Sequence, residues 1–172
     1  MDDEEAIALD ATAIVRALNQ SGVAYVVIGA FAALAQQAPI APTRDIDITP
    51  DRTRENCERL SNALTALGAR VRTQSVPRGL AFNHDGASLL AVDVWNLICR
   101  HGEFDISFHP AAFSAGFRDL VPRARRVRVG DVEVLVADLA DVIRSKEAAG
   151  RPKDVAALPA LYRHQAELRR RT

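Results

Sequence analysis

The chain has 172 residues, of which 48% are hydrophobic and 26% charged, and its formal net charge at pH 7 is zero. A chain of this length and composition is typical of one globular domain with a substantial core. Zero net charge excludes a global electrostatic attraction to nucleic acid or to an anionic membrane, and no apolar run approaches the roughly 20 residues of a membrane helix. The acidic start, residues 1–5, is unlike a secretory signal, so we expect a cytoplasmic protein.

The first 67 residues alternate between helical and strand patterns. Apolar spacing, β-branched runs and charge alternation predict, in chain order, helix, strand, helix, strand and helix at residues 6–19, 23–28, 30–37, 44–49 and 54–67. The first strand is apolar on both faces, as expected of a buried strand. Gly29 separates this strand from the following helix, which is rich in alanine.

The rest of the chain contains hairpin signals and two helical patterns. Strands are predicted at residues 70–73, 80–82, 94–99, 104–109, 126–129 and 132–136, and helices at 139–149 and 152–170. Asp138 is expected to cap the first of these helices and Gly150 to end it, whereas Pro159 is expected to interrupt the second. This order favours an α+β fold with a mixed sheet. We expect a single domain over 1–172, with a core at about 1–137 and C-terminal helices at about 138–172.

Asp45-Ile46-Asp47 is the most informative segment. Residues two apart on a strand share a face, so both carboxylates point one way while Ile46 and Ile48 point into the core. Two like charges close together repel each other, and a divalent cation removes that cost. Magnesium prefers carboxylate oxygens together with water and substrate phosphates. A carboxylate pair that bridges two such ions is suited to in-line displacement at phosphorus.

The residues around this pair favour a phosphate site over an exposed strand edge. Gly29, where a strand turns into a helix, allows phosphate oxygens to approach backbone N–H groups. Ala30 keeps its N–H at the start of that helix, where negative charge is favoured. Arg44, next to the pair, can offset the carboxylates or bind a phosphate.

Residues 26–30 (VVIGA) and 43–48 (TRDIDI) resemble the glycine-strand and D-x-D signature of the polymerase-beta-like nucleotidyltransferase superfamily. The resemblance is strongest to small bacterial members, which include minimal nucleotidyltransferases and toxin–antitoxin proteins. It implies the fold of that family, with metals bound by the D-x-D strand and a third acidic residue on a neighbouring strand. Ala30 departs from the family pattern, which usually has glycine or serine at this place.

Two residues compete for the third carboxylate. Asp105 lies in the segment EFDISF, which repeats the polar and apolar alternation of the D-x-D strand. Asp93 could equally open a strand or cap the helix end before it. We favour Asp105, and we expect Glu103, on the same face but nearer the turn, to lie in solvent.

Lys146 and Lys153 are the only lysines among 22 basic residues. The segment that contains them also looks like a recurrent C-terminal piece of the small family members. A lysine near the triphosphate could stabilise charge on the transferring phosphoryl group. Alternatively, Asp154 and its basic neighbours lock two helices together. We favour a functional role for Lys146.

The resemblance implies an enzyme that transfers a nucleoside monophosphate from a nucleoside triphosphate to an acceptor hydroxyl and releases pyrophosphate, with Mg²⁺ or Mn²⁺ as cofactor. The acceptor could be tRNA or another RNA, a protein or a small molecule. The catalytic and metal-binding residues are then Asp45, Asp47 and Asp105. The nucleotide-binding residues are Gly29, Ala30, Arg44 and Lys146.

The alternative is a catalytically inactive module of the same fold that acts as the antitoxin-like partner of a toxin. The Ala30 departure favours this alternative, as does the lack of an obvious acceptor-binding domain. A nucleic-acid-binding protein without chemistry is disfavoured by the neutral charge. The remaining metal-ligand residue types lack the spacing of a second metal site; they are His84, His101, His109, His164, Cys57 and Cys99.

Overall fold

The structure is a computed structural model, and it describes residues 6–172. The acidic start at 1–5, interpreted above as unlike a secretory signal, lies outside the described residues. None of the helices formed by residues 6–172 is long and apolar enough to cross a membrane.

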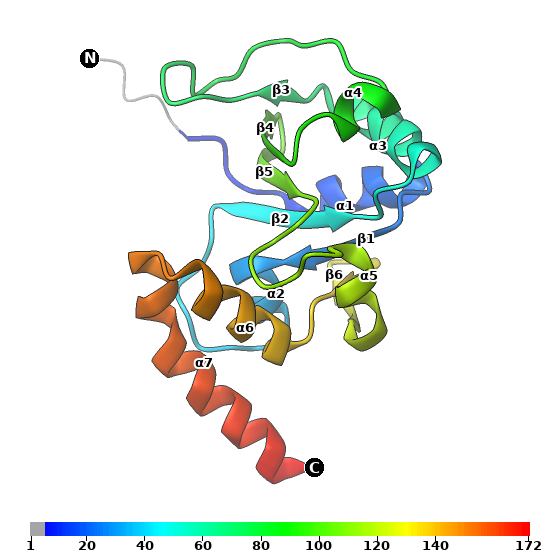
Figure 1. Ribbon diagram of the computed structural model, residues 1–172. Helices are drawn as coiled ribbons and strands as arrows, with labels where there is room; N and C mark the ends of the chain where they lie inside the picture. The colour runs from blue at the N-terminus through cyan, green and yellow to red at the C-terminus, as the bar shows by residue number, and fades with distance from the viewer. Residues whose placement is uncertain (1–5) are drawn as a thin grey trace, which may run out of the picture.

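Seven strands and the helices around them form the fold (Figure 1). The strands are β1 Tyr25–Ile28, β2 Asp45–Pro50, β3 Arg70–Val71, β4 Val94–Cys99, β5 Gly102–Ser107, β6 Arg125–Val129 and β7 Val132–Val136. The α-helices are α1 Ala11–Gln20, α2 Gly29–Ala35, α3 Arg54–Leu67, α4 Gly86–Leu90, α5 Phe117–Leu120, α6 Leu139–Ala149 and α7 Pro152–Arg171, and a 3₁₀ turn, η1, spans Val121–Arg123.

The strands form one mixed sheet in the order β3-β4-β5-β2-β1-β7-β6. β2 runs parallel to β5 and β1 parallel to β7, whereas the other neighbouring strands are antiparallel. The predicted α+β class with a mixed sheet is therefore confirmed. Both predicted hairpins are also present, as β4–β5 and β6–β7.

The two central strands β2 and β5 each have one apolar face and one polar face. Ile46 and Ile48 on β2, and Phe104 and Ile106 on β5, have 0% exposure. Burying side chains of this size stabilises the fold by about 1.5–3 kcal/mol each. A shift of either strand by one residue would bring its aspartates into the core. The core contacts therefore fix which side of the sheet presents the carboxylates.

Several element boundaries agree with the sequence and others differ. α6 begins after Asp138, whose side chain accepts a hydrogen bond from the Ala140 N–H, and it ends at Gly150 in the left-handed conformation, as predicted. α1 begins at Ala11 rather than at residue 6, because Asp10 caps it by accepting from the Ala13 N–H at 3.0 Å. The predicted strand at 80–82 was wrong: only a single bridge forms, between Val71 and Leu80.

The predicted interruption at Pro159 was also wrong. α7 continues through this proline to Arg171 and extends away from the body of the protein (Figure 1). Proline removes the N–H that would bond to the carbonyl four residues earlier. That carbonyl belongs to Val155, which is 54% exposed, so water can satisfy it.

Candidate active site

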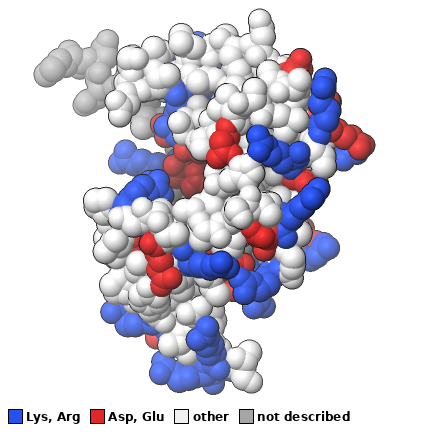
Figure 2. Space-filling model, in the orientation of Figure 1, with Lys and Arg blue, Asp and Glu red and all other residues white. Residues whose placement is uncertain are grey.

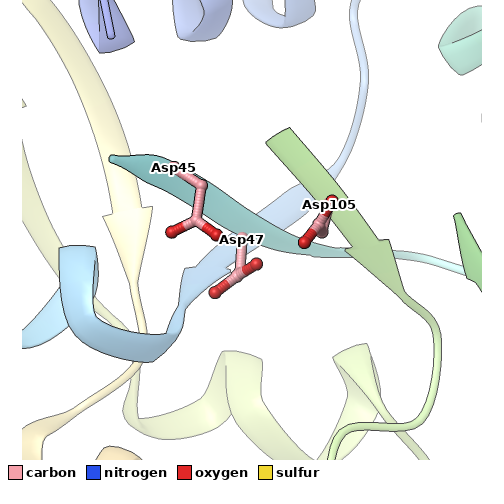
Figure 3. Close-up of side chains that lie close together, drawn as sticks. All are labelled: Asp45, Asp47 and Asp105. Atoms are coloured by element: carbon pink, nitrogen blue, oxygen red, sulfur yellow. The ribbon is translucent and has the colours of Figure 1, made fainter. Parts of the chain in front are cut away.

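Three aspartates from β2 and β5 meet on the polar face of the sheet (Figure 3). The parallel register sets Asp47 opposite Asp105, and Asp45 opposite Glu103. One carboxylate oxygen from each of Asp45, Asp47 and Asp105 lies within 4.8 Å of the others, and each residue is half-buried. Residues 6–172 contain no other group of three His, Cys, Asp or Glu side chains this close.

The charges of this cluster are only partly compensated. The pKa of Asp47 is raised from 3.8 to about 7, first by burial and then by the negative charges of Asp45 and Asp105, although Lys153 and Arg151 oppose this rise. Burial also raises the pKa of Asp105, against the opposing charge and hydrogen bond of Arg72. Such a cluster stabilises an added cation, because a cation removes the repulsion that favours protonation.

Two clefts meet at the carboxylates. The first, of about 390 Å³, lies between the sheet and the α6–α7 junction, and Gly29, Asp47 and Asp105 contribute to its lining. The second, of about 430 Å³, is lined by Asp45 and Asp105 together with residues of the loop after β3. Asn96 and Asp105 border both clefts. Figure 2 shows acidic side chains recessed in this face of the molecule, next to basic ones.

Comparison with known proteins gives structural matches only, since no family model and no curated protein matches the sequence. A Thermotoga maritima protein described as a candidate nucleotidyltransferase superposes with a TM-score of 0.53 at 17% identity, over 89% of this chain and 90% of that chain. The solution structure of the antibiotic-resistance factor ANT(2″)-Ia gives a TM-score of 0.54 at 14% identity, over 86% and 78%.

A crystal structure of ANT(2″)-Ia in complex with adenylyl-2″-tobramycin gives a TM-score of 0.54 at 15% identity, over 86% of this chain and 83% of that chain. The chain has the polymerase-beta-like nucleotidyltransferase fold. In this nucleotidyltransferase fold, the sheet presents the D-x-D pair on β2 and Asp105 on the adjacent strand β5.

Gly29 has a steric role beside Asp47. Its φ is +69°, and a Cβ atom added there would lie 2.6 Å from Oδ2 of Asp47. A Gly29→Ala variant is expected to displace this carboxylate and to weaken Mn²⁺ binding at least about tenfold. The left-handed backbone alone costs alanine about 1–2 kcal/mol.

Gly68→Ala is the matched control for this substitution. Gly68 also has a left-handed backbone, at φ +63°, but an added Cβ would meet nothing within 4 Å. Urea unfolding should show a loss of stability in both variants, whereas Mn²⁺ titration should show weaker binding only in Gly29→Ala. Equal Mn²⁺ affinity in the two variants would contradict a role for Gly29 in positioning Asp47.

The other predicted nucleotide-binding residues differ in their position relative to the first cleft. Ala30 and Arg44 are not part of its lining, and Arg44 is exposed to solvent. Lys146 lines the cleft, and its Nζ lies 3.2 Å from Oδ1 of the buried Asp154. Arg151 also binds Asp154, through Nε at 2.6 Å. The Lys146–Asp154 pair joins α6 to α7, which is the structural alternative considered for this segment, and the Arg151–Asp154 pair lies within the first turn of α7.

Asp93, the competing third carboxylate, lies outside the cluster. It is exposed and pairs with Nδ1 of His109. Asp105 is the aspartate that the register brings next to Asp47.

Cys57 and Cys99 are buried free thiols.

Sequence reasoning missed three polar residues at the site, namely Arg72, Asn96 and Arg151. Asn96 is paired with Asp105 across β4 and β5 and borders both clefts. Arg72 follows β3 and binds Asp105, and Arg151 lines the first cleft beside Asp154. The alternation of Arg70, Val71 and Arg72 was a usable signal for a polar face, but it does not reveal which strand lies alongside.

Proposed function

We propose that this chain is a metal-dependent nucleotidyltransferase, which transfers a nucleoside monophosphate from a nucleoside triphosphate to an acceptor hydroxyl and releases pyrophosphate. The observation that carries the proposal is the cluster of Asp45, Asp47 and Asp105 at the border of two clefts. The nucleotidyltransferase fold of the chain supports this interpretation.

The three aspartates fit a hard divalent cation. They offer only carboxylate oxygens, which Mg²⁺ and Mn²⁺ prefer, and these oxygens lie within 4.8 Å of one another. The raised pKa of Asp47, caused first by burial and then by Asp45 and Asp105, marks negative charge that the protein does not neutralise by itself. When bound, the cation would neutralise charge on the triphosphate and lower the pKa of the acceptor hydroxyl.

The first cleft is the proposed nucleotide site. Gly29 lines this cleft without a side chain that would displace the Asp47 carboxylate, and Lys146 and Arg151 bring positive charge to the same lining. Both side chains also bind Asp154, so they are held in position before the triphosphate arrives. Such preorganised charge stabilises negative charge on the phosphoryl group as it is transferred.

The second cleft, on the Asp45 side, is then available to the acceptor. The acceptor oxygen forms a bond to the α-phosphorus while the bond from that phosphorus to the bridging oxygen breaks, and pyrophosphate leaves with the bonding electrons. The acceptor proton passes to a carboxylate, for which Asp105 is the proposed base, because it borders both clefts.

Three classes of molecule present a suitable acceptor hydroxyl, namely an RNA end, a protein and a small molecule. One structural neighbour, ANT(2″)-Ia, was solved in complex with adenylyl-2″-tobramycin, which supports a small-molecule hydroxyl as the first acceptor to assay. A role in a toxin–antitoxin pair would instead require a protein partner.

The test is binding of each of the four nucleoside triphosphates, with and without magnesium, to the wild type and to Asp45→Ala. The proposal predicts magnesium-dependent binding that the variant loses. Gly68→Ala, which alters the backbone away from both clefts, is the control for general loss of stability. Absence of binding under all conditions would favour the alternative, a non-catalytic module that binds a toxin or antitoxin.

A further inference from the structure

Arg72 directly follows the edge strand β3, and its side chain contacts two acidic residues of β5. Its Nη2 donates a hydrogen bond to Oδ1 of Asp105 at 2.7 Å, and its Nη1 lies 3.6 Å from Oε2 of Glu103. Its Nε donates to the backbone carbonyl of Leu97 at 3.3 Å. The Arg72 side chain is 23% exposed and that of Asp105 is 20% exposed, so both charged groups are largely withdrawn from water.

The position of Arg72 follows from the sheet register. Asp47 on β2 is paired with Asp105 on β5, which is paired with Asn96 on β4. The backbone N–H of Arg72 donates to the Asn96 carbonyl at 3.0 Å. These four residues therefore form one row across neighbouring strands, which are about 4.8 Å apart. An arginine side chain spans the two strand spacings between its own backbone and Asp105.

The bond to Arg72 fixes the orientation of the Asp105 carboxylate. Arg72 engages Oδ1, and Figure 3 shows one oxygen of Asp105 directed toward Asp47. Glu103, which is 40% exposed, adds a second acidic contact to the guanidinium. The planar guanidinium can make these contacts together with the bond to Leu97, which an ammonium group cannot reproduce.

We propose that Arg72 is a positioning residue for the metal site: it holds Asp105 by one oxygen so that the other oxygen joins Asp45 and Asp47 around the cation. This inference rests on the proposed function. A carboxylate that binds metal is commonly hydrogen-bonded by an outer residue, and removal of that partner lowers metal affinity about 10- to 100-fold. If Arg72 instead competed with the cation for Asp105, removal of Arg72 would raise the affinity for metal.

Mn²⁺ binding, followed by electron paramagnetic resonance without nucleotide, distinguishes these effects. We expect Arg72→Met to raise the Kd for Mn²⁺ about 10- to 100-fold, and Arg72→Lys to recover only part of the loss. Arg70→Met is the matched control, because Arg70 lies in β3 and donates two guanidinium hydrogen bonds to the Gly79 carbonyl, away from the carboxylates. This control should bind Mn²⁺ like the wild type.

Thermal unfolding in EDTA, measured on the same variants, separates metal binding from general stability. The inference is supported if Arg72→Met binds Mn²⁺ more weakly than Arg70→Met but unfolds in EDTA at a similar temperature. An unchanged or lower Kd in Arg72→Met, with Mn²⁺ still bound by the wild type, would overturn the role of Arg72 alone. No Mn²⁺ binding by the wild type would overturn both this role and the proposed function.

Discussion

At pH 8 and without divalent cations, Asp47→Asn is expected to unfold at a higher temperature than the wild type. Burial, followed by repulsion from Asp45 and Asp105, raises the pKa of Asp47 from 3.8 to about 7 in the folded protein. Above pH 7 the folded chain therefore carries a partly buried charge that the unfolded chain exposes fully to water. At about 1.4 kcal/mol per pK unit, the full cost is about 4 kcal/mol, and we expect the amide to recover about half of it.

The pH dependence follows from the same shift. A group with a raised pKa in the folded state stabilises the fold below its unfolded pKa, and this contribution is lost as the pH rises through the folded pKa. The advantage of Asp47→Asn should therefore be absent near pH 4, grow between pH 4 and 7, and be complete at pH 8.

Thermal unfolding across this pH range measures the effect. For a domain of this size, about 2 kcal/mol corresponds to a rise in Tm of roughly 4–8 °C. Asp93→Asn, which changes an exposed aspartate outside the cluster that pairs with His109, should produce no such rise at pH 8. With magnesium present, the wild type should gain stability and Asp47→Asn should not. A Tm at pH 8 that falls on substitution would contradict an uncompensated charge at Asp47.

Affinity for Mn²⁺ is expected to fall about 50-fold between pH 7 and pH 5. A cation binds the deprotonated carboxylate, so a proton on Asp47 competes with the metal below its pKa of about 7. A single competing proton lowers the affinity about tenfold per pH unit. The pKa of Asp105 is also raised, first by burial, and this shift acts in the same direction.

Titration with Mn²⁺ alone isolates this dependence, since a nucleotide would add the titration of its own phosphate groups. Calorimetry in buffers of different ionisation enthalpy should show proton release on Mn²⁺ binding at pH 6 and little release at pH 8.5. An affinity that does not change between pH 5 and pH 8 would contradict the raised pKa of Asp47.

Short-range patterns in the sequence were sufficient to predict the polar face of the site. Alternation at period two assigns Asp45 and Asp47 to one face of β2, and Ile46 and Ile48 to the other, and the structure has these isoleucines fully buried. The same alternation on β5 predicted that Asp105 lies on the polar face of that strand. The choice between Asp105 and Asp93 as the third carboxylate depended on strand pairing, because the parallel register of β2 and β5 sets Asp105 opposite Asp47.

Contacts between segments distant in sequence could not be predicted from local patterns. Arg72 reaches Asp105 only because β3, β4 and β5 are neighbours in the sheet. Lys146 was favoured as a nucleotide ligand from its rarity, but its bond to the buried Asp154 depends on how α6 meets α7. The sequence pattern around Pro159 indicated a break, and solvent exposure of the preceding turn allows the helix to continue.

We propose above all that Asp45, Asp47 and Asp105 together hold a divalent cation for a nucleoside triphosphate. Anomalous scattering from crystals grown with Mn²⁺ and a non-hydrolysable nucleoside triphosphate tests it most directly. We expect an anomalous peak within bonding distance of oxygens of these three aspartates, with the triphosphate in the cleft lined by Gly29 and Lys146. A nucleotide bound elsewhere, or Mn²⁺ absent from the three carboxylates at saturating concentration, would contradict it.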